Sequence, residues 1–140
     1  MVTSYMQTNS LPTKILIVED EDTLCESLKR VFEREGYEVD VAGSAESALA
    51  VLEKRSFDLI ITDIMLPGIN GLEFLNKCRD RNPGQAVIIM TAYDNLWTAD
   101  EALALGAYAY ITKPLMHDEI KSIVRNALSR KDANSVHKSV

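Results

Sequence analysis

Residues 15–41 read ILIVEDEDTLCESLKRVFEREGYEVDV, and this stretch contains the unit from which the fold is built. Its first four residues are apolar and mostly β-branched, which is typical of a strand buried on both faces. Apolar residues then recur at helical spacing from Leu24 to Phe32, and Gly36 is a typical residue to follow the end of a helix. At Tyr37–Val41 apolar and acidic residues alternate, which indicates an edge strand. The stretch therefore predicts a strand, a helix and a second strand.

The same alternation continues along the rest of the chain. Further strands and helix N-caps are predicted at the following positions: strands at Leu59–Ile61, Val87–Met90 and Ala107–Ile111, and N-caps at Ser44, Asn70 and Asp94. A last helical pattern runs from Ile120 to Leu128. Five alternating strand–helix units predict an α/β fold, in which a parallel sheet carries helices on both faces.

Length and composition favour one domain. The chain has 140 residues, of which 46% are hydrophobic, and this is enough for a single buried core. We expect a flexible leader over residues 1–12, the domain over residues 13–130, and a flexible tail or the start of a linker over residues 131–140. Cys25 and Cys78 form no C-x-x-C pair and fall in helical patterns, so we expect two buried free thiols.

Charge and hydropathy exclude several classes of function. The formal net charge is −6, and the basic residues form no continuous run, which argues against direct nucleic-acid binding. No apolar stretch is long enough to cross a bilayer, and the opening residues MVTSYMQTNSLPT lack the features of a secretory signal. We therefore expect a cytoplasmic protein that does not bind membranes.

Charged residues gather at the predicted ends of three strands. They are Glu19 and Asp20 after the first strand, Asp63 after the third and Lys113 after the fifth. In an open parallel sheet, ligands bind beyond the carboxyl ends of the strands, so these side chains are expected to converge there. Each pair of carboxylates at ~5 Å and an effective dielectric of ~20 costs roughly 3 kcal/mol, which one lysine does not offset. A hard divalent cation does offset it, and oxygen ligands that leave room for water favour Mg²⁺.

Each of these residues also has an ordinary interpretation when it is taken alone. Asp20 or Glu19 could cap the helix that follows, and Asp63 could belong to a turn before Pro67. Lys113 could be a solvated surface side chain. The functional interpretation rests on the combined position of these residues at three strand ends.

Four strings carry a resemblance to a known family: ILIVEDE at 15–21, TDIMLPGINGLEFL at 62–75, IIMTAY at 88–93 and GAYAYITKP at 106–114. Together they resemble the receiver domain of two-component response regulators, over nearly all of residues 13–130. The resemblance implies a flavodoxin-like, three-layer α/β/α fold with five parallel strands in the order 2-1-3-4-5. It also implies a phosphorelay signalling switch rather than an enzyme, one that catalyses only its own phosphorylation and slow dephosphorylation.

The resemblance further implies roles at the strand ends. Asp63 would accept a phosphoryl group from a histidine kinase, a phosphotransfer protein or a small phosphodonor. Mg²⁺ would be bound by Asp20, Asp63 and the backbone carbonyl of Met65. Glu19, the first member of the acidic pair and a common variant at that place, would act largely through water. Lys113 would bridge to the phosphoryl oxygens.

More positions carry over from the family. Thr91 would hydrogen-bond a phosphoryl oxygen, and Tyr110 would move inward as Thr91 shifts. Without the resemblance, Thr91 would be an ordinary helix-flanking residue and Tyr110 a half-buried strand aromatic. Pro114 would follow a cis peptide bond. Met65 and Tyr93 stand at the two places that flank the hydrolytic water in the family, and neither orients water well, so we expect slow self-dephosphorylation.

The predicted helix over residues 94–106 offers a partner surface. On a helical wheel, Leu96, Ala99 and Leu103 share the face that is expected to pack on the core. Trp97 projects away from that face. Its side chain is either an exposed contact for self-association or a downstream effector, or a tryptophan that folds over its own helix. In the family, this helix, the fifth strand and the last helix form the output surface.

Other interpretations predict different behaviour. A phosphorylation-independent interaction module would keep the fold but take up no phosphoryl group. A flavin site needs a phosphate-binding loop after the first strand, where Glu19, Asp20 and Glu21 would repel phosphate. A phosphatase of the haloacid dehalogenase type needs a second Asp two residues after the first, where Met65 stands.

Overall fold

The structure is a computed structural model. Strands and helices alternate along the part of the chain that it describes. It describes residues 11–92 and 96–138, with the side chains of residues 96–97 and 130–138 outside the description. The elements are β1 (Lys14–Val18), α2 (Asp22–Arg34), β2 (Glu38–Ala42), α3 (Ala45–Lys54), β3 (Leu59–Asp63), α4 (Gly71–Arg81), β4 (Ala86–Thr91), α5 (Leu96–Ala104), β5 (Ala109–Thr112) and α6 (His117–Lys138). The predicted alternation is therefore confirmed.

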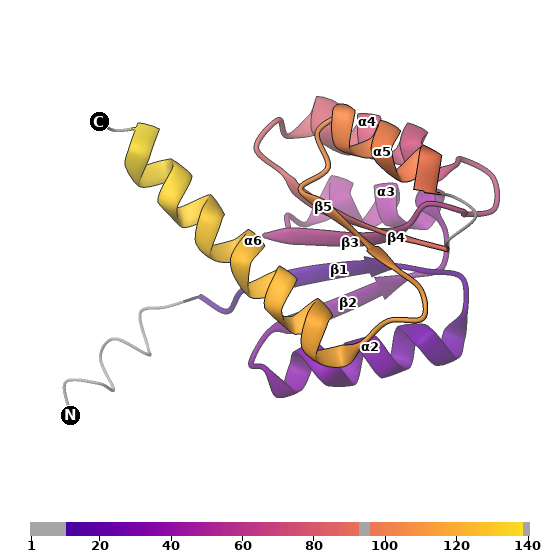
Figure 1. Cartoon of the computed structure of the whole chain (residues 1–140), viewed down its shortest axis with the longest axis horizontal. Coiled ribbons are helices and arrows are strands. Elements are labelled where there is room, and N and C mark those ends of the chain that lie inside the picture. Colours follow the sequence, from indigo (N-terminus) through magenta and orange to yellow (C-terminus); the bar gives the residue numbers. More distant parts are fainter. Residues whose placement is uncertain (1–10, 93–95, 139–140) are drawn as a thin grey trace.

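In the described part of the chain, the strands form one parallel sheet in the order β2-β1-β3-β4-β5 (Figure 1). This order confirms the flavodoxin-like fold that the resemblance implied. Ile17 of β1 pairs with Val41 on one side and with Ile61 on the other, so β1 lies inside the sheet. Inner strands are covered on both faces, and their residues are almost all buried. β2 is an edge strand, as its sequence predicts, but its burial does not follow the apolar–acidic alternation throughout, since Val39 is buried whereas Val41 is 42% exposed.

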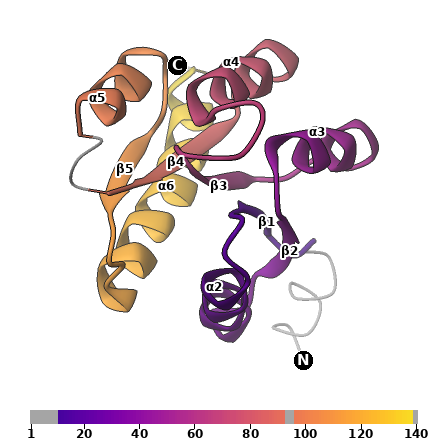
Figure 2. The same cartoon turned by 90° about the vertical axis from the view of Figure 1, so that its right-hand side faces the viewer.

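Helices cover both faces of the sheet, which gives three layers (Figure 2). α2 and α6 pack on one face, where Phe32 and Ile120 join Ile17 in an apolar cluster. α3, α4 and α5 pack on the other face, where Phe74 and Ala102 join a second cluster. Successive residues of each inner strand therefore enter two separate cores.

Two of the predicted N-caps are confirmed. Ser44 accepts a hydrogen bond from the amide of Ser47 at 3.1 Å, and the hydroxyl of Ser47 accepts one from the amide of Ser44 at 3.2 Å, which completes a capping box on α3. Asn70 accepts a hydrogen bond from the amide of Glu73 at 2.9 Å on α4. Asp94, the third predicted cap, lies outside the described residues. Both α3 and α4 therefore begin at well-defined positions beyond the carboxyl ends of β2 and β3.

The prediction for the core-facing side of α5 was wrong at one residue. Ala99 is fully buried, as expected, but Leu103 is 39% exposed and Ala102 is fully buried. Two alanines allow the helix to lie close against the sheet, whereas a leucine would hold it further away. Helical spacing alone could not identify the buried face of α5, because apolar residues of this helix lie around most of its circumference. The side chains of Leu96 and Trp97 lie outside the described residues.

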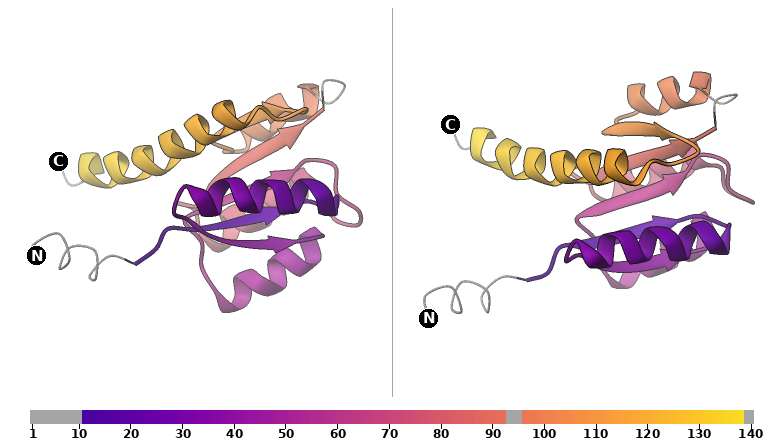
Figure 3. Two further views of the ribbon diagram at one scale, coloured as in Figure 1. Left: turned by 90° about the horizontal axis from the view of Figure 1, so that it is seen from below. Right: turned by 60° about the horizontal axis from the view of Figure 1, so that its bottom comes forward.

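α6 continues to Lys138, beyond the domain boundary predicted at residue 130 (Figure 3). The segment predicted as a tail or the start of a linker contains neither Gly nor Pro from residue 131 to residue 138, so its sequence holds no signal that ends the helix. Most of the predicted leader, residues 1–10, lies outside the described residues. None of the helices in the described part of the chain is both long and apolar enough to cross a membrane.

Both cysteines are free and buried, as predicted. Burial, with a smaller contribution from nearby carboxylates, raises the pKa of Cys25 to about 11. Burial raises the pKa of Cys78 to about 12. The thiol of Cys25 also donates to the backbone carbonyl of Glu19 at 3.0 Å. Both thiols therefore stay protonated at neutral pH and are weak nucleophiles.

Replacing Gly71 with alanine is expected to lower the free energy of unfolding by about 1–3 kcal/mol. Gly71 begins α4, and its amide donates to the carbonyl of Ile64 at 2.9 Å. A Cβ at this position would lie 2.5 Å from the Cα of Ile64, so the backbone beside Asp63 would have to shift. Urea denaturation measures the loss. A Cβ at Gly43 would have no atom of the described residues within 4 Å, so Gly43→Ala is the control. Equal stability of Gly71→Ala and wild type would contradict the prediction.

Candidate functional site

The carboxyl ends of the parallel strands form one edge of the sheet, which faces the viewer in Figure 2. The residues at these ends are Glu19 after β1, Asp63 in β3, Thr91 in β4 and Lys113 after β5. The fold thus brings together the strand ends at which the sequence predicts a site. We call this region the acidic edge, defined by Glu19, Asp20, Asp63 and Lys113.

The ammonium group of Lys113 lies between two carboxylates. Its Nζ is 2.7 Å from Oε1 of Glu19 and 2.5 Å from Oδ2 of Asp63. Glu19 is 1% exposed and Asp63 is 7% exposed, so both ion pairs are largely shielded from solvent. The amide of Lys113 donates to the carbonyl of Thr91 at 2.7 Å, which ties the end of β5 to β4. Both the backbone and the side chain of Lys113 are therefore held at the acidic edge.

The second oxygen of each buried carboxylate accepts a backbone amide. Oδ1 of Asp63 accepts from Met65 at 2.9 Å, and Oε2 of Glu19 accepts from Glu21 at 3.1 Å. Each donor lies two residues after its acceptor, so the turn at the strand end orients the carboxylate. Asp63 and Glu19 are thus each held through both of their oxygens.

Asp20 completes a cluster of three carboxylates. One oxygen from each of Glu19, Asp20 and Asp63 lies within 4.8 Å of the others, and Asp20 is exposed whereas the other two are buried. When all groups are ionised, three carboxylates and one ammonium group leave a net negative charge at the acidic edge. Oxygen donors of this kind suit a hard divalent cation that keeps several waters, so the residues present fit Mg²⁺.

Burial and pairing both act on the ionisable groups of the acidic edge. Burial is the main cause that raises the pKa of Glu19, and the hydrogen bond from Lys113 opposes it only in part. For Lys113, burial acts to lower the pKa, but the hydrogen bonds to Asp63 and Glu19 outweigh it, so the pKa is raised. Lys113 is therefore a stable positive charge at neutral pH, whereas Glu19 takes up a proton more readily than an exposed glutamate does.

Thr91 and Tyr110 lie on neighbouring strands and on the same face of the sheet. Thr91 is fully buried, and its hydroxyl donates to the carbonyl of Ala92 at 3.1 Å. Tyr110 pairs with Ile89, which lies two residues before Thr91, so the side chains of Ile89 and Thr91 point the same way. Tyr110 is half-buried against the apolar cluster that α3, α4 and α5 cover. The two predicted switch residues therefore share the face on which α5 packs.

Other predicted residues lie around the acidic edge or outside the description. Met65 is 61% exposed, and its backbone amide donates to Oδ1 of Asp63 at 2.9 Å. The peptide bond between Lys113 and Pro114 is cis. Tyr93 lies outside the described residues.

One contact near the acidic edge has no clear signal in the sequence. Oε2 of Glu46, in the first turn of α3, accepts a hydrogen bond at 3.2 Å from the amide of Ile69, in the loop between β3 and α4. These residues are 23 positions apart. A glutamate in the first turn of a helix is explained equally well by the helix dipole, so only the packing of α3 beside this loop reveals the contact.

Comparison with known proteins identifies the family. The sequence model of the response regulator receiver domain family matches residues 15–125 of the chain. The chain is 34% identical over 125 residues to the probable transcriptional regulatory protein TcrX of Mycobacterium tuberculosis, covering 89% of this chain and 53% of the relative. It is 36% identical over 115 residues to the transcriptional regulatory protein ZraR of Escherichia coli O157:H7, covering 82% of this chain and 26% of the relative. The chain thus spans about half, or less, of the length of these relatives.

Solved structures agree with the sequence comparison. The response regulator receiver domain protein (CheY-like) of Methanospirillum hungatei JF-1 has a TM-score of 0.84 and 35% identity, covering 89% of this chain and 99% of that chain. The family match, the strand order and the residues of the acidic edge point to one conclusion. The chain is a member of the response regulator receiver domain family, which acts in phosphorylation-based two-component signalling.

Proposed function

We propose that Asp63 accepts a phosphoryl group from a histidine kinase or a phosphotransfer protein, in a Mg²⁺-dependent reaction. A small phosphodonor can take the place of the protein donor. The observation that carries this proposal is the position of the Asp63 carboxylate, held at the acidic edge between Lys113 and the amide of Met65. Membership of a family that signals by phosphorylation supports it.

The reaction forms one bond and breaks another. A carboxylate oxygen of Asp63 attacks phosphorus, and the bond from phosphorus to the donor's nitrogen or oxygen breaks, so its electron pair leaves with the donor. The Nζ of Lys113, 2.5 Å from Oδ2 of Asp63, can pair with an oxygen of the arriving phosphoryl group. The protein contributes mainly position and charge neutralisation, which is the usual pattern for phosphoryl transfer.

The residues around Asp63 would also hold the metal ion. Asp20, Asp63 and the backbone carbonyl of Met65 would bind Mg²⁺, and Glu19 would act through water. The 1% exposure of Glu19 and its bonds to Lys113 and the amide of Glu21 support an indirect part for this residue. When bound, the ion supplies positive charge that offsets the carboxylates and the phosphoryl oxygens.

Phosphorylation would reach the partner surface through Thr91 and Tyr110. The hydroxyl of Thr91 donates to the carbonyl of Ala92, and a phosphoryl oxygen on Asp63 offers it a more strongly charged acceptor. As Thr91 moves, Tyr110 would move inward on the same face, and the surface of α5, β5 and α6 would change. An effector domain or a downstream protein would bind there, with Trp97 as a proposed contact.

The test is phosphoryl uptake by the wild-type chain. The protein is incubated with acetyl phosphate or phosphoramidate, with Mg²⁺ or with EDTA, and its intact mass is measured. We expect the mass of one phosphoryl group to appear with Mg²⁺ and to be nearly absent with EDTA. No uptake under either condition would overturn the proposal and favour a phosphorylation-independent interaction module.

Mg²⁺ is also expected to stabilise the folded protein. The ion would bind the folded acidic edge and not the unfolded chain, so about 10 mM Mg²⁺ with a dissociation constant of about 1 mM would add about 1.4 kcal/mol to the free energy of unfolding. Urea denaturation with and without Mg²⁺ measures the gain. Asp20 is exposed, so Asp20→Ala should fold normally and lose most of the gain. An equal gain in Asp20→Ala would place the bound ion elsewhere.

The phosphorylated form is expected to be long-lived. Met65 and Tyr93 lack the acid and amide groups that would orient a water molecule for attack on phosphorus. After the phosphodonor has been removed by gel filtration, the decay of the phosphorylated mass should take minutes or longer. A half-life of seconds would contradict this expectation.

A further inference from the structure

The loop between β3 and α4, residues 64–70, carries the Met65 carbonyl that the proposed function assigns to the metal. Its first part is fixed by two hydrogen bonds: the amide of Ile64 donates to the carbonyl of Met90, at the end of β4, at 3.0 Å, and the amide of Met65 donates to Oδ1 of Asp63 at 2.9 Å. Its end is fixed where the amide of Gly71 donates to the carbonyl of Ile64 at 2.9 Å. In its middle, the side chains of Leu66 and Ile69 pack on the apolar cluster that α3, α4 and α5 cover, and an attachment of the backbone there would add to this packing.

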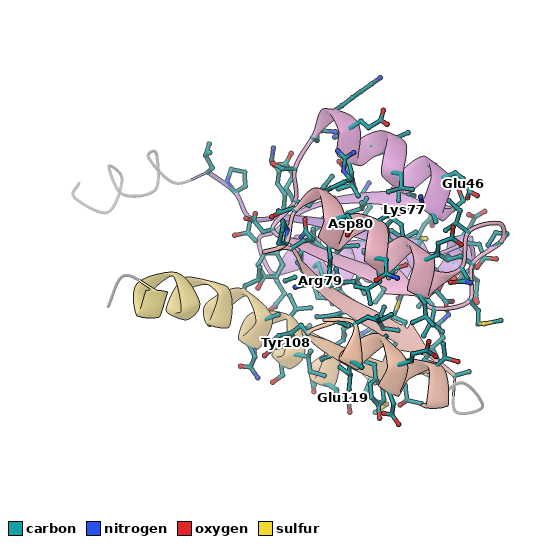
Figure 4. The ribbon with its side chains drawn as sticks, turned by 90° about the horizontal axis from the view of Figure 1, so that it is seen from above. Glu46, Lys77, Arg79, Asp80, Tyr108 and Glu119 are labelled. Carbon is teal, nitrogen blue, oxygen red and sulfur yellow. The ribbon has the colours of Figure 1, made fainter. Side chains whose placement is uncertain are left out.

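Glu46 of α3 supplies such an attachment. Its Oε2 accepts a hydrogen bond from the amide of Ile69 at 3.2 Å, and Figure 4 shows Glu46 at the end of α3 that lies beside this loop. The preceding residue, Gly68, has a φ of +76°, and a Cβ there would lie 2.5 Å from Oε2 of Glu46. Glycine at this position therefore allows the carboxylate to approach the loop backbone closely.

The helix that carries Glu46 is itself well anchored. The capping box between Ser44 and Ser47 closes its first turn, and Ala45 is fully buried in the core. Glu46 stands between these residues, so its backbone is held while its side chain reaches the loop. The alternative is that Glu46 serves only the dipole of its own helix, which would require no contact with the loop.

We propose that Glu46 is a positioning residue for the metal site, which holds the middle of the β3–α4 loop and so keeps the backbone of Met65 in place beside Asp63. The role rests on the proposed function. Glu46 does not touch the ion, and its influence passes through the loop. Groups that bond directly to a metal ligand typically change metal affinity by ~10–100-fold when they are lost. Because Glu46 is one step further away, its loss should weaken Mg²⁺ binding by about three- to tenfold.

Three variants of the full chain distinguish the effect of the hydrogen bond between Glu46 and Ile69 from the effect of the negative charge of Glu46. Glu46→Ala removes both the charge and the acceptor, whereas Glu46→Gln removes the charge and keeps an acceptor oxygen. Glu53→Ala removes the same charge from an exposed position of the same helix. For each variant, calorimetry gives the Mg²⁺ dissociation constant, hydrogen exchange gives the protection of the Ile69 amide without metal, and urea denaturation in EDTA checks the fold.

We expect faster exchange at Ile69 and weaker Mg²⁺ binding in Glu46→Ala, with Glu46→Gln and Glu53→Ala close to wild type. Unchanged Mg²⁺ affinity in Glu46→Ala would overturn the role of Glu46 and leave the proposed function intact. Equal weakening in Glu46→Gln and Glu46→Ala would overturn it too, since charge alone would explain the effect. A wild-type chain that binds no Mg²⁺ would overturn the proposed metal site and, with it, this role.

Discussion

Replacing Asp63 with alanine is expected to abolish phosphoryl uptake, with a fall in rate of at least ~1,000-fold, because the nucleophile itself is removed. Asp63 ends β3 at the acidic edge, and Lys113 and the amide of Met65 hold its two oxygens. The neighbouring carboxylates are poor substitutes. Glu19 is 1% exposed, and Asp20 lies on the exposed side of the cluster. Intact mass after incubation with acetyl phosphate and Mg²⁺ measures the uptake.

The matched control for this prediction is Asp40→Ala. Asp40 lies in the edge strand β2 and forms an ion pair with Arg55 at 2.6 Å, so its replacement removes one carboxylate away from the strand ends. This variant should take up one phosphoryl group as the wild type does. Normal uptake by Asp63→Ala would assign the phosphoryl group to another residue and refute the main proposal.

The second large effect is expected from Lys113→Met, measured without metal. Removing the ammonium group leaves Glu19 and Asp63 facing each other in a buried place without their cation. Loss of one partner of a buried ion pair typically costs about 3–5 kcal/mol, and we expect the lower end because the Lys113 side chain is 24% exposed. Urea denaturation in EDTA at about pH 8 measures the loss. Phosphoryl uptake should fall as well, since Lys113 would no longer pair with the phosphoryl oxygens.

The loss in Lys113→Met should depend on pH. The pKa of Glu19 is already raised in the wild type, mainly by burial, and loss of the hydrogen bond from Lys113 would raise it further. A group whose pKa is raised by folding costs stability as the pH rises through that raised value. The deficit should therefore be smaller at about pH 5 than at about pH 8, and Mg²⁺ should reduce it at both.

Lys77→Met is the control for the stability measurement. Lys77, labelled in Figure 4, lies on α4 and is exposed, so its replacement removes the same charge from the surface. Its effect should stay within about 0.5 kcal/mol at both pH values. A deficit in Lys113→Met that is equally small, or that does not change with pH, would mean that Lys113 does not balance the buried carboxylates.

Much of the fold could be predicted because its signals are local. The ILIV run of β1, the alternation of β2 and the caps Ser44 and Asn70 each depend on residues within a few positions of one another. The burial of Leu103 was predicted wrongly because the apolar residues of α5 do not define a single face. The buried face is the one on which Ala99 and Ala102 pack closely on the sheet.

The site could be predicted in part for a related reason. Parallel strands end at one edge, so the charged residues at three strand ends had to approach one another once the strand order was known. The sequence could not tell how the carboxylates differ. In the structure Glu19 is buried against Lys113, whereas Asp20 is exposed.

By itself, the sequence determined the alternating strands and helices, the parallel sheet and the gathering of Glu19, Asp20, Asp63 and Lys113 at its edge. The tertiary structure alone decided which oxygen meets which donor. Glu19 and its partner Lys113 are 94 positions apart, and Glu46 and Ile69 are 23 apart. Periodicity acts over a few residues, but burial and the choice of hydrogen-bond partner depend on groups that only the folded chain brings together.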